Sequence, residues 1–119
     1  MSGDKVLVIY TGWSDRFWGT QEYFDHPYLT KEAAEKVVLE KGVRVLAVDT
    51  ASPDESNGDD GFGVHETVLG MGGVIVENLA NVNKILDGEG GESEWMVSFV
   101  PLYLGGEEDG SPIRAFAWK

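Results

Sequence analysis

A histidine and a glutamate twelve residues apart, His65 and Glu77, are the side chains best suited to bind a metal ion. Histidine is the commonest metal-ligating side chain and glutamate supplies a hard oxygen, so the pair suits zinc or manganese. Taken alone, these two residues are a weak signal, and a structural histidine is the alternative interpretation of His65. His26, which precedes Pro27, is interpreted as a turn residue.

Several other kinds of site do not fit the sequence. Residues 70–73, Gly-Met-Gly-Gly, match neither phosphate-loop pattern and precede an expected strand rather than a helix. The acidic segment at residues 54–61 lacks the spacing of a calcium loop and its closing glutamate. No Gly-x-Ser-x-Gly motif occurs, and the absence of cysteine removes disulfides, thiolate nucleophiles and Cys-based zinc sites.

Charge and length narrow the function classes further. The 119 residues include 9 Lys or Arg against 21 Asp or Glu, a net charge of −12, which argues against binding to nucleic acid or to a membrane surface. The longest apolar runs, at residues 6–10 and 99–104, are far shorter than the ~20 residues that span a bilayer. The first residues lack the positive charge of a signal peptide. We therefore expect a cytoplasmic protein with a single domain over residues 1–119.

A strand, a helix and a second strand are predicted in the first half of the chain. Residues 6–10 are apolar and β-branched, and residues 43–48 alternate and are rich in valine. Residues 31–41 place apolar side chains on one helical face, with Thr30 as the N-cap and Gly42 after the last turn. These three elements predict a βαβ-like unit in an α/β fold.

Shorter elements are predicted in the second half. Residues 51–63 and 87–94 are acidic and glycine-broken, so we expect loops there. Residues 74–77 predict a short strand, and residues 95–104 and 113–118 predict a pair of strands around a glycine-rich connection. Short helical segments are expected at residues 65–69 and 79–86.

The order of seven short segments resembles one family. They are Thr-Gly-Trp at 11–13, His-Pro-Tyr-Leu at 26–29, Val-Asp-Thr-Ala-Ser-Pro-Asp at 48–54, His-Glu-Thr-Val-Leu at 65–69, Val-Glu-Asn-Leu at 76–79, Pro-Leu at 101–102 and Gly-Ser-Pro-Ile-Arg-Ala at 110–115. In this order and spacing the chain resembles the C-terminal half of the putative cyclase family, which includes bacterial kynurenine formamidases (arylformamidases) and isatin hydrolase. The resemblance implies an α/β fold, part of the swivelling β/β/α architecture, with a mixed sheet and one main helix.

The resemblance also implies a metal-dependent hydrolase acting on amide or lactam bonds. His65 and Glu77 correspond to the family's downstream ligands of zinc or manganese, whereas the upstream His-x-Gly-Thr-His-x-Asp-x-Pro motif is absent from this sequence. Trp13, Phe17 and Trp18 follow the strand whose carboxyl end faces the site in the family. They are expected either to line an aromatic substrate-binding pocket or only to pack. No catalytic residue is assigned.

These implications give the functional expectation. The chain is expected to be a truncated part of a kynurenine formamidase-like hydrolase that is inactive alone, with metal bound weakly or not at all. The missing ligands would come from a second chain carrying the other half, or from a second copy in a homo-oligomer such as a dimer. The alternatives are a pseudoenzyme or small binding module without catalysis, and a remnant with no activity of its own.

Overall fold

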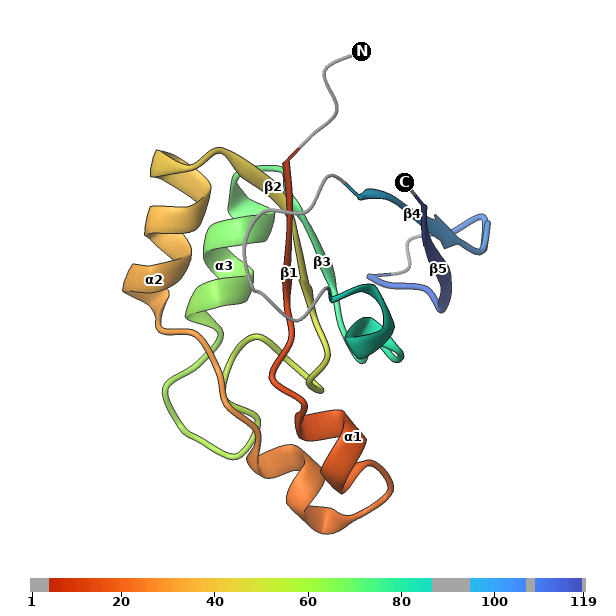
Figure 1. Ribbon diagram of the computed structural model, residues 1–119. Helices are drawn as coiled ribbons and strands as arrows, with labels where there is room; N and C mark the ends of the chain where they lie inside the picture. Colours follow the sequence, from red (N-terminus) through yellow and green to blue (C-terminus); the bar gives the residue numbers. More distant parts are fainter. Residues whose placement is uncertain (1–4, 87–94, 107–108, 119) are drawn as a thin grey trace. The chain divides into compact units, whose positions relative to one another are not determined.

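The computed structural model describes residues 5–86, 95–106 and 109–118, and the predicted acidic loop at 87–94 lies outside them (Figure 1). The described residues form a three-stranded parallel sheet, a two-stranded antiparallel sheet and a few helices, which confirms the predicted α/β class. The chain divides into two compact units, Met1–Asn83 and Lys84–Lys119, and each is described by itself.

The parallel sheet of the first unit has the strand order β1-β2-β3. Strand β1 spans Lys5–Ile9, β2 spans Val43–Val48 and β3 spans Val74–Val76. All three strands are rich in valine, whose branched side chain suits a pleated surface. The predicted strand at 43–48 is confirmed with its bounds unchanged, and those at 6–10 and 74–77 are confirmed with shifts of one residue at their ends.

The predicted helix at 31–41 is present as two consecutive helical segments. Helix α2 spans Lys31–Glu35, and the chain continues without a break as a π-helix, η2, over Lys36–Glu40. The hydroxyl oxygen of Thr30 accepts a hydrogen bond from the backbone N–H of Ala33 at 3.1 Å, so the predicted N-cap is confirmed. Gly42 follows the helical segment with a φ of 72°, which a side-chain-bearing residue adopts only with strain.

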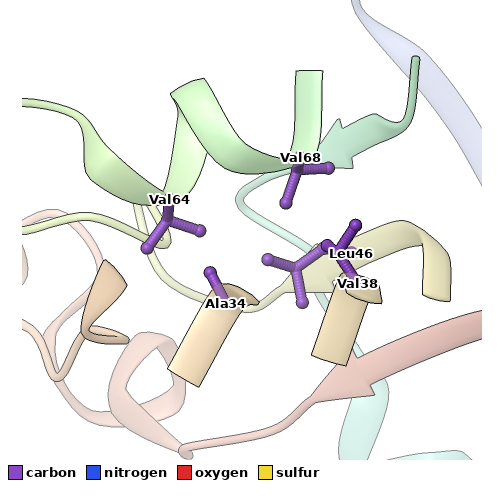
Figure 2. Close-up of a cluster of buried hydrophobic side chains, with 5 residues drawn as sticks. All are labelled: Ala34, Val38, Leu46, Val64 and Val68. Carbon is purple, nitrogen blue, oxygen red and sulfur yellow. The ribbon is translucent and has the colours of Figure 1, made fainter. Parts of the chain in front are cut away.

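Helices α2 and α3 pack together on one face of the parallel sheet (Figure 1). Helix α3 spans Gly63–Gly70 and is longer than the single turn predicted at 65–69. Figure 2 shows the side chains that fill the space between these elements, which are Ala34, Val38, Leu46, Val64 and Val68. Fully burying a valine or leucine side chain stabilises a fold by about 1.5–3 kcal/mol, so this cluster holds the two helices on the sheet.

The aromatic segment after β1 is helical, although no helix was predicted there. Helix α1 spans Trp13–Phe17, and a 3₁₀ turn, η1, spans Gln21–Asp25. The predicted helix at 79–86 is only a 3₁₀ turn, η3, over Val82–Ile85. No helix among the described residues is long and apolar enough to cross a membrane.

The second unit contains the predicted strand pair. Strand β4 spans Met96–Pro101 and β5 spans Ile113–Trp118, and the two are antiparallel, with Met96 opposite Trp118. Large apolar side chains on both strands are exposed, among them Met96 and Phe116. A two-stranded sheet is marginally stable by itself in water, so this hairpin needs further apolar contacts.

Candidate functional site

Polar residues follow each strand of the parallel sheet at its carboxyl end. Thr11 follows β1 by two residues, Asp49 directly follows β2 and Glu77 directly follows β3. In open α/β sheets, ligands bind outside the carboxyl ends of the strands. This edge of the sheet is therefore where a functional site is expected.

Three side chains at this edge form a continuous Asp-His-Glu arrangement. The Nδ1 atom of His65 lies 2.8 Å from Oδ2 of Asp54, and its Nε2 atom lies 3.0 Å from Oε1 of Glu77. The Asp54 side chain is 7% exposed, whereas those of His65 and Glu77 are 28% and 33% exposed. The arrangement thus has a buried carboxylate on one side of the imidazole and a solvent-accessible carboxylate on the other.

Helix α3 and the loop before it place His65 in this arrangement. His65 is in the first turn of α3, and Asp54 accepts hydrogen bonds from the backbone N–H groups of Val64 and His65, both at 2.9 Å. These N–H groups have no partner within the helix, and a carboxylate at the positive end of the helix dipole is favourable. One aspartate therefore caps the helix and contacts the ring.

A second buried carboxylate, Asp49, fixes the turn after β1. It accepts hydrogen bonds from the backbone N–H of Thr11 at 3.1 Å, the hydroxyl of Thr11 at 2.8 Å and the backbone N–H of Gly12 at 2.9 Å. Gly12 has a φ of 77° and precedes α1. Asp49 thus connects the carboxyl ends of β1 and β2 and sets the direction in which α1 leaves the sheet.

Tyr23 and Asn78 connect the aromatic segment to the end of β3. The buried hydroxyl of Tyr23 donates to the side-chain oxygen of Asn78, and it lies 3.4 Å from the backbone oxygen of Asp49. Burial raises the pKa of Tyr23 above its usual value, and the nearby carboxylates of Asp49 and Glu77 raise this pKa further. Tyr23 is therefore a neutral hydrogen-bond donor beside the candidate site.

The three predicted substrate-binding residues lie on and just after α1. The rings of Trp13 and Phe17 contact each other with centroids 4.4 Å apart, and the indole N–H of Trp13 donates to the backbone oxygen of Glu22 at 3.1 Å. Trp18 is 69% exposed and packs edge-on against Tyr23, with centroids 5.1 Å apart. Through Tyr23 and Asn78, Trp18 is thus connected to the chain segment that carries Glu77.

A small cavity lies between the carboxyl ends of β1 and β2. Its volume is about 80 Å³, which is too small for an aromatic substrate. It is lined by Ile9, Thr11, Pro27, Tyr28, Leu29, Val48, Thr50 and Pro53. None of the three predicted aromatic residues lines this cavity, so the substrate role of Trp13, Phe17 and Trp18 stays a prediction.

His26 is buried, and both of its ring nitrogens lie within hydrogen-bonding distance of an oxygen atom. Its Nδ1 atom lies 2.7 Å from the backbone oxygen of Pro27, and its Nε2 atom lies 2.6 Å from the hydroxyl of Ser56. These contacts attach the loop at 51–63 to the segment after η1. His26 therefore has a structural role, but its backbone is extended, so the prediction of a turn at this position is wrong.

Asp49, Asp54, Tyr23 and Asn78 were not singled out as functional residues from the sequence. A signal for the two aspartates was present, because Asp49 directly follows a buried strand and both aspartates lie in the segment 48–54 that carries the family resemblance. Within the ranges that the structure describes, no group of three or more His, Cys, Asp or Glu side chains converges as a metal site. His65 and Glu77 offer two ligand atoms, because Asp54 contacts the other nitrogen of the ring.

Comparison with known families matches the first part of the chain. Residues 1–55 match the family model described as putative cyclase. No curated protein matches the chain. The matched segment is similar to the putative cyclase family and includes β1, β2 and Asp54, whereas His65 and Glu77 lie beyond it.

Proposed function

We propose that this chain is a member of the putative cyclase family and supplies part of a metal-dependent, kynurenine formamidase-like site for hydrolysis of an amide or lactam bond. His65 and Glu77 would be its ligands for zinc or manganese, and further ligands would come from another polypeptide or a second copy. The observation that carries the proposal is the 3.0 Å separation of His65 Nε2 and Glu77 Oε1, with the other ring nitrogen held by Asp54.

The donor set fits a divalent metal ion. Imidazole nitrogen and carboxylate oxygen bind zinc at about 2.0–2.2 Å, so two such ligand atoms on one tetrahedral ion are about 3.3–3.6 Å apart. The separation of 3.0 Å between Nε2 and Oε1 is slightly shorter, so a small movement of the partly exposed Glu77 side chain would admit the ion. A metal-ligating histidine usually donates its other ring N–H to a carboxylate or carbonyl, and Asp54 is positioned to accept it.

The residues of this chain would hold and orient the reacting groups. A bound zinc or manganese ion would supply Lewis acidity for attack by water on the amide carbonyl. Glu77 would contribute negative charge and a hard oxygen ligand, and Asp54 would accept the N–H of Nδ1 when Nε2 binds the metal. The neutral hydroxyl of Tyr23 holds Asn78, and with it the backbone next to Glu77, in a fixed position.

The number of ligands limits what the chain does alone. A catalytic zinc site has three protein ligands and an open position, and this chain offers two ligand atoms at the described edge. The isolated chain should therefore bind metal weakly and should not hydrolyse amides. A partner that contributes further ligands would complete the site.

A second candidate function is a binding module without catalysis. His65 and Glu77 contact each other directly, so the pair satisfies itself as an ion pair when the ring is protonated. A pseudoenzyme that kept the fold and lost the reaction would have this arrangement without any metal. The two candidates differ in whether a partner carrying the upstream ligands restores hydrolysis.

Hydrolysis of N-formylkynurenine in the presence of zinc or manganese tests the proposal. The pure chain should give no turnover, and addition of a polypeptide carrying the His-x-Gly-Thr-His-x-Asp-x-Pro segment should restore it. The restored activity should be lost with His65→Ala and kept with Glu66→Gln, which changes an exposed carboxylate on the same helix. Turnover by the pure chain, or restored turnover that survives His65→Ala, would contradict the proposal.

A further inference from the structure

We propose that Ser56 is a nucleophile that accepts an acyl group from an activated ester, with His26 as its general base. The Nε2 atom of His26 lies 2.6 Å from Oγ of Ser56, which is 30 residues away in the sequence. Of the two histidines in the chain, His65 contacts carboxylates and His26 contacts this hydroxyl. Neither Ser56 nor His26 belongs to the candidate metal site, so this proposal does not depend on the proposed function.

The other ring nitrogen of His26 determines how the two side chains pair. Nδ1 lies 2.7 Å from the backbone oxygen of Pro27, and a carbonyl oxygen only accepts hydrogen bonds, so Nδ1 carries a proton. In the neutral ring, Nε2 then presents a lone pair, and the hydroxyl of Ser56 donates to it. In this orientation an imidazole can remove the proton of a serine as the hydroxyl oxygen attacks.

The two residues differ in exposure as this reaction requires. His26 is 4% exposed, whereas Ser56 lies in an exposed part of the loop at 51–63. The base is therefore shielded from water, while a dissolved ester can reach the hydroxyl. A serine without such a partner is a weak nucleophile, because its hydroxyl keeps its proton.

Hydrogen bonds on both sides of the pair hold the two chain segments together. On one side, the side-chain amide of Asn57 donates to the backbone oxygen of Phe24 at 3.1 Å. On the other side, the backbone N–H of Leu29 donates to the backbone oxygen of Pro53 at 2.9 Å. The segments are thus fixed against each other at two further points, so the imidazole and the hydroxyl stay within reach of each other.

The proposed step is acyl transfer to Oγ of Ser56. With p-nitrophenyl acetate, Oγ forms a bond to the acetyl carbonyl carbon, the bond from that carbon to the phenolate oxygen breaks, and p-nitrophenolate leaves. The hydroxyl proton passes to Nε2 of His26 and from there to solvent. An activated ester suits the site because its leaving group departs as an anion and needs no proton from an acid.

Acetylation of the intact chain by p-nitrophenyl acetate, mapped by peptide mass spectrometry, tests this proposal. The control is Asp59→Ser, which introduces a second serine at an exposed position in the same loop. Ser56 should be acetylated about 100-fold faster than this introduced serine, which is the lower end of what a general base contributes. His26→Gln should lower the rate at Ser56 by a similar factor, because an amide does not take up the proton.

Two outcomes would overturn the proposal. The first is acetylation of Ser56 at the rate of the introduced serine, and this comparison changes neither residue of the pair. The second is an unchanged rate at Ser56 in a His26→Gln chain whose circular dichroism shows that it is folded. Fast acetylation of Ser56 in the Asp59→Ser chain, with the expected fall in His26→Gln, would support both assigned roles.

Discussion

The Nε2 atom of His65 lies 3.0 Å from the Oε1 atom of Glu77, although the two residues belong to different elements. His65 is in the first turn of α3, and Glu77 directly follows β3. The short connection from α3 to β3 returns the chain to the carboxyl edge of the sheet, which brings the two side chains together. A position on a helix and directly at the end of a strand suits a ligand pair, because both backbones are held by regular structure.

The two carboxylates that contact His65 should differ in their contribution to stability. Asp54→Ala removes a buried carboxylate that accepts three hydrogen bonds, and leaves the first N–H groups of α3 without this partner. We expect the free energy of unfolding to fall by about 2–3 kcal/mol. Glu77→Gln changes a partly exposed pair and should cost less than about 1 kcal/mol. Urea unfolding of both variants measures the difference, and equal losses would contradict it.

Asp49→Ala should be among the most destabilising substitutions at the edge of the sheet. It leaves the N–H groups of Thr11 and Gly12 and the hydroxyl of Thr11 without their acceptor, which is the buried carboxylate of Asp49 in a partly buried network. The expected loss is about 3 kcal/mol or more. Asp60→Ala, at an exposed position in the loop, is the control and should change stability by less than about 0.5 kcal/mol. If urea unfolding gives the same free energy of unfolding for Asp49→Ala and Asp60→Ala, Asp49 does not anchor the turn.

Tyr23 should make the chain less stable in alkaline solution. Its pKa is raised from 10.0 in the folded state, so folding favours the neutral phenol. The stabilisation is complete at pH values below the pKa of the unfolded chain, near 10, and is lost as the pH rises through the higher folded value. Urea midpoints at about pH 8 and pH 11 measure this loss. Tyr23→Phe should be less stable at pH 8 by about 1 kcal/mol and should lose less stability between the two pH values. A loss of equal size in wild type and variant would contradict the assignment to Tyr23.

The chain should self-associate. Exposed apolar side chains lie on both strands of the hairpin, including Met96 and Phe116, and apolar surface of this kind favours association. A twofold dimer is the commonest closed assembly. Sedimentation equilibrium at micromolar concentration should give a mass above the 13.0 kDa of one chain, and Phe116→Ser should lower it. A single 13.0 kDa species would contradict the prediction and favour a stand-alone module.

Much of the first unit could be predicted from local sequence. The valine-rich runs at 6–10 and 43–48, the N-cap at Thr30 and the glycine after the helical segment each carry a short-range signal, and each is confirmed. Helix α1 and the turn η1 could not be predicted in the same way. Trp13 and Phe17 have the i, i+4 spacing of one helical turn, but a single pair is too short a pattern to predict a helix, and the contact between their rings stabilises α1.

The candidate site was predicted only in part. His65 and Glu77 were proposed from their residue types and from the family resemblance, and the structure places them side by side. Asp49, Asp54 and Tyr23 were missed because their roles depend on partners distant in sequence, such as Asn78, which lies 55 residues after Tyr23. An aspartate in an acidic loop has the same local sequence whether it is solvated or buried, so only the tertiary structure distinguishes Asp54 from its neighbours.

Calorimetric titration of zinc into the isolated chain tests the central claim most directly. The account predicts weak binding, with a dissociation constant in the micromolar to millimolar range (about 4–8 kcal/mol), because the chain offers two ligand atoms. Binding should be lost in His65→Ala and in Glu77→Gln and should be unchanged in Glu66→Gln. Submicromolar binding that survives His65→Ala would contradict the assignment of His65 and Glu77 as the ligands.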